Sequence, residues 1–382
     1  MSYLHFYTRH SQSSKYPGKP CGDHWVEWRS PESTTILLAD GIGSGIKAHI
    51  AAQTTLARLK RLLQAGFSLR DSFSRLITTM QKAVAENLPF SAITAVRILN
   101  NGQATILNFE NPTPLLINRN KASLLHFRSV TLNENVLQEA TAWLDEDDAL
   151  FIMSDGVVQA GMGRGLPAGW GSPNVAEWME MQIRMGQKKA DLPRLLRQQA
   201  KLKWGKTTGD DITVLGIFCR KGKVVNILTG PPVEREKDPE VVSRFLNADG
   251  VKVICGATTA KMAAREMDAE LEMSRDSADG ISPPRYHLEG INLVTEGAVT
   301  LTQLYNIIDW PPERLLSDNP VTDLYCLLDV ADRVNFWVGT ARNPANDSVY
   351  FQQQGIISRD KIVPLLEEKL RGQGKLVTVQ WV

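Results

Sequence analysis

Two hydrophobic periods alternate along the first part of the chain. An apolar run at residues 34–39 predicts a short buried strand that ends at Asp40. After three closely spaced glycines, apolar residues recur with a helical period over residues 46–63. A second helical period covers residues 69–88, and Pro89 ends it. The pattern therefore predicts a strand, a tight loop and two consecutive helices.

Residues 92–99 and 103–109 show a strand pattern on either side of Asn101-Gly102, which is typical of a tight hairpin. The strand pattern continues at 115–118 and 124–127, and a wholly apolar strand follows at 149–153. Helices are expected at 175–185 and 192–203, before a final strand at 212–218. This mixture predicts an α+β domain.

After residues 221–223 the pattern changes, and strands alternate with helices. Strands are expected at 224–228, 251–255, 291–294, 334–338 and 376–382, and helices at 239–247, 261–273, 301–308, 323–330 and 361–371. Such alternation is typical of an α/β domain with a mainly parallel sheet. We therefore expect two domains, 1–222 and a smaller one at 223–382, with a polar loop at 276–284.

Composition narrows the class of protein. The chain has 382 residues, of which 43% are hydrophobic and 22% charged, as in ordinary globular proteins. Lys+Arg 43 against Asp+Glu 42 gives no strong field, so neither nucleic acid nor an anionic membrane is an expected partner. Its four cysteines form no Cys-x-x-Cys pair, which disfavours zinc and disulfides. With no signal-like N-terminus and no run of ~18 apolar residues, a cytoplasmic location is expected.

Four short acidic segments stand at the edges of predicted strands, each beside glycine. They are Gly22-Asp23, Ala39-Asp40-Gly41-Ile42-Gly43-Ser44-Gly45, Ser154-Asp155-Gly156-Val157 and Gly209-Asp210-Asp211-Ile212-Thr213. Glycine lets the backbone bend there, so that a carboxylate can turn inward. One such segment is more often a plain turn, but four can form one site. Ligands that are all oxygen suit magnesium or manganese.

In this order, the four segments resemble the metal-dependent type 2C protein phosphatases, specifically the bacterial branch typified by stage II sporulation protein E. The resemblance covers roughly residues 1 to 220. It implies an α-β-β-α sandwich and a serine/threonine phosphatase that uses two divalent metals, manganese or magnesium. Such a pair activates water and offsets charge on the phosphoryl group.

The resemblance also implies roles for individual residues. Asp40 would bridge the two metals, the Gly41 carbonyl and Asp23 would complete one site, and Asp155 and Asp210 the other. Asp40, Asp155 and Asp210 are thus the predicted catalytic residues. Either Asp210 or Asp211 is the direct ligand, and we favour Asp210, with Asp211 as support.

Two residues are candidates for substrate contact. Ser44 precedes a predicted helix, where it either caps the helix or touches phosphate, and capping is favoured. Arg164 is the cation of a glycine-rich segment, residues 161–171, which is either a flap over the site or a surface loop. Gln159 stands where many relatives have an acidic residue, which leaves substrate preference and pH dependence open.

The second domain offers one candidate site. Gly256, Thr258 and Thr259 follow a predicted strand and open a helix, whose free amides could hold a small anion. The alternative, which we favour, is that the threonines cap the helix. This domain is accordingly expected to be a regulatory or docking domain of unknown ligand.

The leading hypothesis is a phosphoprotein phosphatase of bacterial signalling. By resemblance, its substrate would be a phosphorylated signalling protein such as an anti-sigma-factor antagonist. One alternative is a metal-poor phosphatase fold that acts as a binding module. Another is a phosphatase of small metabolites that the second domain recognises.

Overall fold

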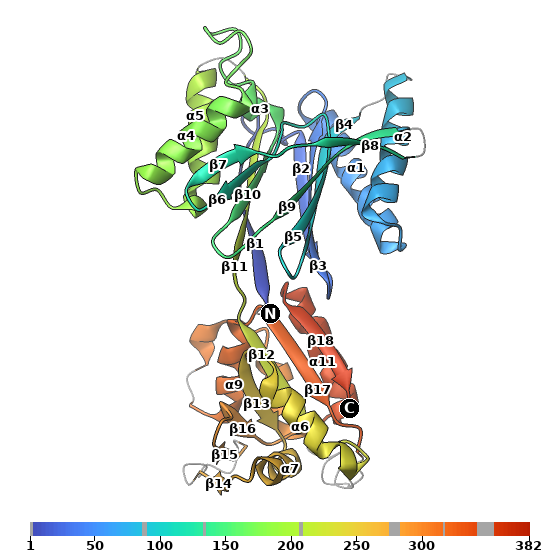
Figure 1. The fold of residues 1–382 in the computed structure, drawn as a ribbon, viewed down its shortest axis with the longest axis vertical. Coiled ribbons are helices and arrows are strands. Elements are labelled where there is room, and N and C mark those ends of the chain that lie inside the picture. The colour runs from blue at the N-terminus through green and yellow to red at the C-terminus, as the bar shows by residue number, and fades with distance from the viewer. Residues whose placement is uncertain are drawn as a thin grey trace. The chain divides into compact units, whose positions relative to one another are not determined.

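The structure, a computed structural model, describes residues 3–85, 90–132, 135–205, 209–274, 283–315, 318–341 and 355–382. The chain divides into two compact units, Tyr3–Lys221 and Gly222–Val382 (Figure 1). Among the helices in these ranges, none combines the length and the apolar character that a membrane span requires.

The first unit contains two antiparallel sheets. The six-stranded sheet has the order β2-β3-β4-β5-β9-β8, and the five-stranded sheet has the order β1-β11-β10-β6-β7. The strands of the first are β2 (Asp23–Arg29), β3 (Ser33–Gly41), β4 (Ser91–Leu99), β5 (Gln103–Phe109), β8 (Arg128–Leu132) and β9 (Asn135–Trp143). Those of the second are β1 (Leu4–Ser13), β6 (Leu115–Asn118), β7 (Lys121–Leu124), β10 (Ala149–Met153) and β11 (Ile212–Lys221).

Helices cover the outer face of each sheet (Figure 1). α1 (Ile46–Gln64) and α2 (Leu69–Ala85) pack on the six-stranded sheet, and α4 (Ser172–Arg184) and α5 (Leu192–Trp204) on the other. Successive strand residues point to opposite faces, so Leu37 packs among the helices and Leu38 between the sheets. The predicted α-β-β-α sandwich is thus confirmed.

The second unit is built on one sheet with the order β14-β15-β16-β13-β12-β17-β18. Its strands are β12 (Val224–Thr229), β13 (Val251–Cys255), β14 (Leu271–Met273), β15 (Arg285–Leu288), β16 (Leu293–Thr295), β17 (Arg333–Val338) and β18 (Leu376–Trp381). All of these pair in parallel except β14 and β15 at one edge. The prediction of a mainly parallel sheet is therefore confirmed.

Both faces of this sheet are covered. α6 (Asp238–Asn247) and α7 (Ala257–Met267) pack on one face, and α8 (Ala298–Ile307), α9 (Pro320–Asp329) and α11 (Arg359–Gly372) on the other. Each strand therefore alternates between two cores, with Ile227 in one and Leu228 in the other.

Several predicted boundaries were wrong. The helix expected at 261–273 ends earlier, because Asp268 adopts the left-handed conformation (φ 49°) and the chain then enters β14. The strand expected at 124–127 is β7, which ends at Leu124 after a tight turn from β6. Most of the loop expected at 276–284, together with the end of the helix expected at 69–88, lies outside the described residues.

Candidate metal centre

The four acidic segments meet at one end of the two sheets. Asp23 begins β2 and pairs with Asp40 in β3, while Asp155 follows β10 and Asp210 precedes its neighbour β11. The backbone N–H of Asp155 donates to Asp40 Oδ2 at 3.4 Å, which joins the two sheets. Sheet pairing therefore gathers carboxylates that are far apart in sequence.

The environment of Asp23 is unfavourable for a charged side chain. Its side chain is buried, at 1% exposure, and among the described residues neither carboxylate oxygen has a hydrogen-bond partner. Burial raises the pKa of Asp23 to about 6. A buried carboxylate without a partner is costly unless a cation compensates it, so this environment fits a divalent metal.

The neighbouring carboxylates repel one another. Burial, together with the charges of Asp23 and Asp155, raises the pKa of Asp40 to about 10. Burial also raises the pKa of Asp155, where the charge of Asp210 adds to the effect, and the pKa of Asp210 itself. Such a cluster of oxygen donors suits magnesium or manganese, whose charge would relieve the repulsion.

Direct ligation by particular residues stays a prediction. Within the described ranges, no three His, Cys, Asp or Glu side chains are arranged to hold one ion. Backbone or solvent oxygens would therefore have to take part in each metal shell, as the expected role of the Gly41 carbonyl requires.

The adjacent Asp210 and Asp211 differ in their contacts. Asp211 Oδ1 accepts the backbone N–H of Lys15 at 2.7 Å, and Oδ2 accepts that of Gly22 at 2.8 Å. Asp210 Oδ1 accepts only a local bond, from the backbone N–H of Asp211 at 2.8 Å. Asp211 thus ties the segment before β2 to the start of β11 with both of its oxygens.

Close packing explains two of the motif glycines. A Cβ on Gly41 would lie 2.1 Å from the carbonyl oxygen of Ala48 in α1. A Cβ on Gly156 would lie 2.0 Å from the carbonyl oxygen of Asp211. A side chain at Gly41 would therefore push α1 away from the end of β3, and one at Gly156 would push apart the segments that carry Asp155 and Asp210.

The two substrate candidates follow different aspartates of the centre in the sequence: Ser44 follows Asp40, and Arg164 follows Asp155. The N-cap of α1 is Gly45, so the expectation that Ser44 caps this helix was wrong.

The guanidinium of Arg164 lies against Gly205 after α5, where a Cβ would be 2.0 Å from Nη1. Gly171 N–H donates to the Val158 carbonyl at 2.8 Å, which holds residues 161–171 onto the short helix α3 (Asp155–Val158). Contact of Ser44 or Arg164 with a phosphate stays a prediction.

Some supporting residues were missed from the sequence. Gln12 Nε2 donates to the Asp23 carbonyl at 3.1 Å and to Thr213 Oγ1 at 2.9 Å. Gln159 Nε2, at the position noted as unusual, donates to Asp155 Oδ2 at 2.8 Å. Gln12 carries no local signal, because its role depends on β1 pairing with β11.

In the second unit, the polar groups at the strand ends bond to one another. The N-cap of α7 is Gly256, so Thr258 and Thr259 do not cap this helix as expected. Thr259 Oγ1 instead accepts the Gly230 N–H at 2.8 Å, which links the residue after β12 to the first turn of α7. The anion site at Gly256, Thr258 and Thr259 stays a prediction.

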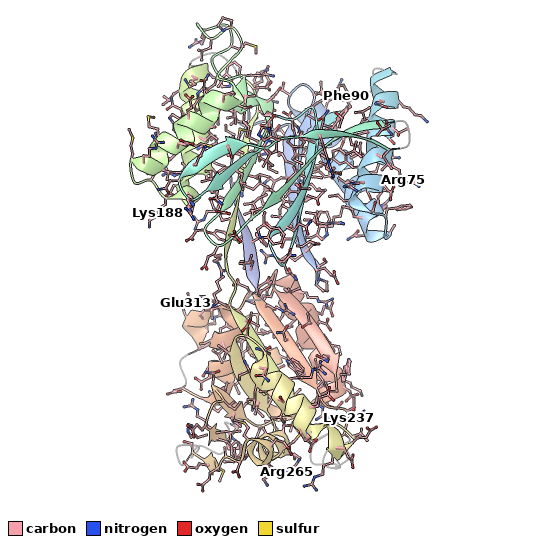
Figure 2. All side chains as sticks on the ribbon, viewed as in Figure 1. Arg75, Phe90, Lys188, Lys237, Arg265 and Glu313 are labelled. Carbon is pink, nitrogen blue, oxygen red and sulfur yellow. The ribbon has the colours of Figure 1, made fainter. Side chains whose placement is uncertain are left out.

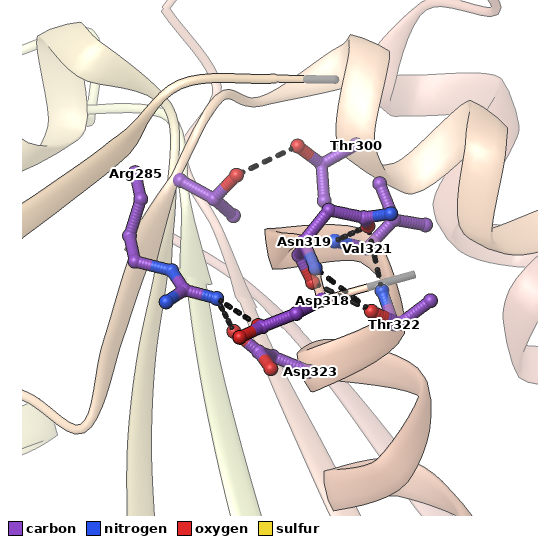
Figure 3. Close-up of polar contacts among 8 residues, drawn as sticks. Arg285, Thr300, Asp318, Asn319, Val321, Thr322 and Asp323 are labelled. Carbon is purple, nitrogen blue, oxygen red and sulfur yellow. Dashed lines mark hydrogen bonds and ion pairs between the residues drawn. The ribbon is translucent and has the colours of Figure 1, made fainter. Parts of the chain in front are cut away.

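A second cluster of polar side chains in this unit joins β15 to the start of α9 (Figure 3). Arg285 donates to Asp318 at 3.1 Å and also to Asp323, and Asn319 forms a capping box with Thr322 at the start of α9. These contacts fix the helix against the antiparallel edge of the sheet, and each of them is accounted for by that structural role.

Comparison with known proteins identifies the first unit. Residues 30–219 match the family model described as Stage II sporulation protein E. No curated protein sequence matches this chain. Similar solved structures include the phosphatase domain with a regulatory fragment of SpoIIE from Bacillus subtilis, at 16% identity and a TM-score of 0.49 over 58% of this chain and 63% of that one. The RsbU and RsbW domains of a Mycobacterium tuberculosis protein match at 13% identity and a TM-score of 0.46, over 64% of this chain and 68% of that one.

The chain thus spans 63% of the length of that SpoIIE structure. RsbX in complex with magnesium matches at 17% identity and a TM-score of 0.40, over 57% of this chain and 99% of that one. The family match covers all the acidic segments after Asp23, and the segment with Asp23 pairs directly with Asp40. Residues 30–219 thus form a domain of the stage II sporulation protein E family.

Proposed function

We propose that this chain is a metal-dependent serine/threonine phosphatase acting on a phosphorylated protein. The observation that carries the proposal is the meeting of four acidic segments at one end of the sandwich, around the buried Asp23 carboxylate that lacks a hydrogen-bond partner among the described residues. Membership of residues 30–219 in the sporulation family supports it.

In this proposal Asp40 would be shared by two divalent cations, manganese or magnesium. Asp23 and the Gly41 carbonyl would hold one of them, and Asp155 and Asp210 the other. When bound, the cations supply an activated water and neutralise the charge of the phosphoryl group. The contacts of Asp211 with backbone amides support its role as a structural residue beside the ligand Asp210.

Hydrolysis of an aryl phosphate by the full chain tests the proposal. We expect turnover with Mn²⁺ or Mg²⁺ and none with a chelator. Asp40→Asn should lower kcat by more than a thousandfold, because it removes the carboxylate that both cations share. The variant should stay folded in chelator, since the raised pKa of Asp40 leaves this carboxyl uncharged without metal, and a neutral amide of the same shape can take its place. Substantial activity of Asp40→Asn would contradict the metal assignment.

A surface next to the centre favours a protein substrate. A groove of about 470 Å³ lies between α1 and α2, and Phe90, labelled in Figure 2, lines it. Three apolar side chains at the start of α1 and in the loop before it are exposed: Ile42 at 51%, Ile46 at 59% and Ile50 at 55%. The Ile42 N–H donates to the Phe90 carbonyl at 3.0 Å, which connects the groove to the loop after Asp40. Exposed apolar surface of this kind is typical of protein binding.

Two rival functions make different predictions. A small-metabolite phosphatase would hydrolyse small phosphates with a kcat/KM at least equal to that for a phosphoserine protein, whereas our proposal expects the protein to be preferred. A metal-poor binding module would show no turnover with either substrate and no Mn²⁺ binding. The physiological substrate would be a signalling protein such as an anti-sigma-factor antagonist, and the second unit would regulate the enzyme or dock its partner.

A further inference from the structure

Trp204, the last residue of α5, contacts two acidic segments at once. Its indole Nε1–H donates to the carbonyl oxygen of Gly156 at 2.8 Å, and Gly156 directly follows Asp155. The same ring covers Gly209, where a Cβ would lie 2.3 Å from Cδ2 of the indole. Gly209 directly precedes Asp210. One side chain thus touches the neighbour of each of these aspartates.

The two segments are also packed directly on each other. As noted above, Gly156 leaves no room for a Cβ against the Asp211 carbonyl oxygen. Ser154 Oγ also accepts the Thr213 N–H at 2.9 Å, which links the residue after β10 to β11. The two backbones are therefore held together at these points, and the indole adds a third contact between the two segments.

The helix that carries Trp204 is well anchored. Leu196 and Ala200 of α5 are fully buried in the core against β10 and β11. Lys203 Nζ lies 4.7 Å from the centre of the Trp170 ring. The indole is therefore presented from a rigid element, which a positioning residue requires.

We propose that Trp204 is a positioning residue that sets the distance between Asp155 and Asp210, and so the affinity of the site they form for a divalent cation. This inference rests on the proposed metal site and adds a residue that the acidic motifs do not contain. Side chains behind metal ligands commonly change metal affinity by 10–100-fold when they are replaced.

Calorimetric titration of the metal-free full chain with Mn²⁺ tests the inference. Trp204→Phe keeps a ring but removes the donor to the Gly156 carbonyl, and we expect it to weaken binding at one of the two cation sites by about tenfold. Trp178→Phe is the matched control, because Trp178 lies on α4 and packs edge to face with Trp170, with ring centroids 5.6 Å apart. It should bind Mn²⁺ as the unmodified chain does.

Gly209→Ala provides a second arm that keeps the indole. Its added methyl group would force the ring to shift, so it should weaken the same binding step, measured at a temperature at which unfolding in chelator shows the variant to be folded. Unchanged Mn²⁺ affinity in both Trp204→Phe and Gly209→Ala would overturn the inference. Absence of Mn²⁺ binding by the unmodified chain would instead overturn the proposed function, and the inference with it.

Discussion

At the residue scale, Asp210 and Asp211 show how adjacent carboxylates can divide two tasks. Both oxygens of Asp211 accept backbone N–H groups, from Lys15 and Gly22. An Asn at this position has only one acceptor oxygen, so one of the two amides would face an NH₂ group. We expect Asp211→Asn to lower the free energy of unfolding of the first unit by about 1–3 kcal/mol in chelator.

The matched variant is Asp210→Asn. It should cost little stability in chelator, because Asp210 makes only a local bond, but it should remove Mn²⁺ binding at one site. Urea unfolding and Mn²⁺ titration of both variants would separate the two roles. A larger loss of Mn²⁺ affinity in Asp211→Asn, with stability preserved, would reverse the assignment.

The sequence located the acidic residues of the centre but not the residues that hold them. Asp23, Asp40, Asp155 and Asp210 each stand beside glycine in a recognisable local pattern. Gln12 and Trp204 have no such pattern, since their partners lie 201 and 48 residues away along the chain. Their contacts follow from sheet order and helix placement, which local periodicity does not determine.

At the element scale, α1 combines an apolar stripe with positive charge. Its residues include Lys47, Arg58, Lys60 and Arg61, and it contains no Asp or Glu. Ile50 and Arg58 line the groove between α1 and α2. Arg75, labelled in Figure 2, is a positively charged residue of α2. A negatively charged phosphoprotein would complement this helix in charge as well as in apolar surface.

We expect Ile50→Asp to lower kcat/KM for a phosphoprotein by about tenfold while leaving aryl phosphate hydrolysis unchanged, since it alters docking surface and no carboxylate of the centre. Leu202→Asp, on the exposed face of α5, serves as the control and should leave both activities unchanged. Equal losses on the two substrates would point to damage at the centre and contradict a docking role.

Two arginines around the buried Glu139 tie α2 to the edge of the six-stranded sheet. Glu139 of β9 is fully buried and accepts two bonds from Arg70 of α2, at 2.5 and 2.6 Å, and one from Arg128 of β8 at 2.9 Å. The hydrogen bond from Arg70, with help from Arg128, lowers the pKa of Glu139. The carboxylate is therefore more acidic in the folded chain than in the unfolded one.

The sign of the pH dependence follows from that lowered pKa. Glu139 stabilises the fold fully above the ordinary carboxyl pKa, and this contribution is lost as the pH falls through the lowered value. Glu139→Gln should cost about 2 kcal/mol at pH 7 and progressively less below about pH 4. Urea unfolding at both pH values measures this, with the exposed Glu177→Gln as control. A cost that does not depend on pH would contradict the argument.

Strong periodicity predicted most elements, and weak periodicity accounts for the failures. β4, β5, β10 and the long helices α1 and α2 have clear apolar patterns, and each was expected close to its place. β8 and β9 were missed. Their segment, 128–143, carries the exposed Val136 and the buried Glu139, so its polar pattern does not match its burial. Partners on other strands and on α2, rather than local sequence, stabilise it.

At the scale of the whole molecule, each unit has cores of its own. Among the residues that the structure describes, the first contains three hydrophobic clusters, one between its sheets and one under each helical layer. The second contains two, one on each face of its parallel sheet. The change from hairpins to alternating strands and helices was visible in the sequence, whereas strand order was not, because β1 and β11 pair across almost the whole first unit.

Separate cores lead us to expect two thermal transitions, of which Mn²⁺ raises only one. Suppose that Mn²⁺ binds only the folded first unit and is present at a concentration a hundred times its dissociation constant. It would then stabilise that unit by about 2.7 kcal/mol and leave the second unit unaffected. Phe245→Ala, in the second unit, should lower only the other transition, because removing this fully buried ring costs about 3–5 kcal/mol. Scanning calorimetry with Mn²⁺ and with chelator, on the full chain and on Phe245→Ala, distinguishes the cases. A single transition that responds to both the cation and the substitution would mean that the two units unfold together. A ligand that stabilises the second unit would then also stabilise the acidic centre of the first unit.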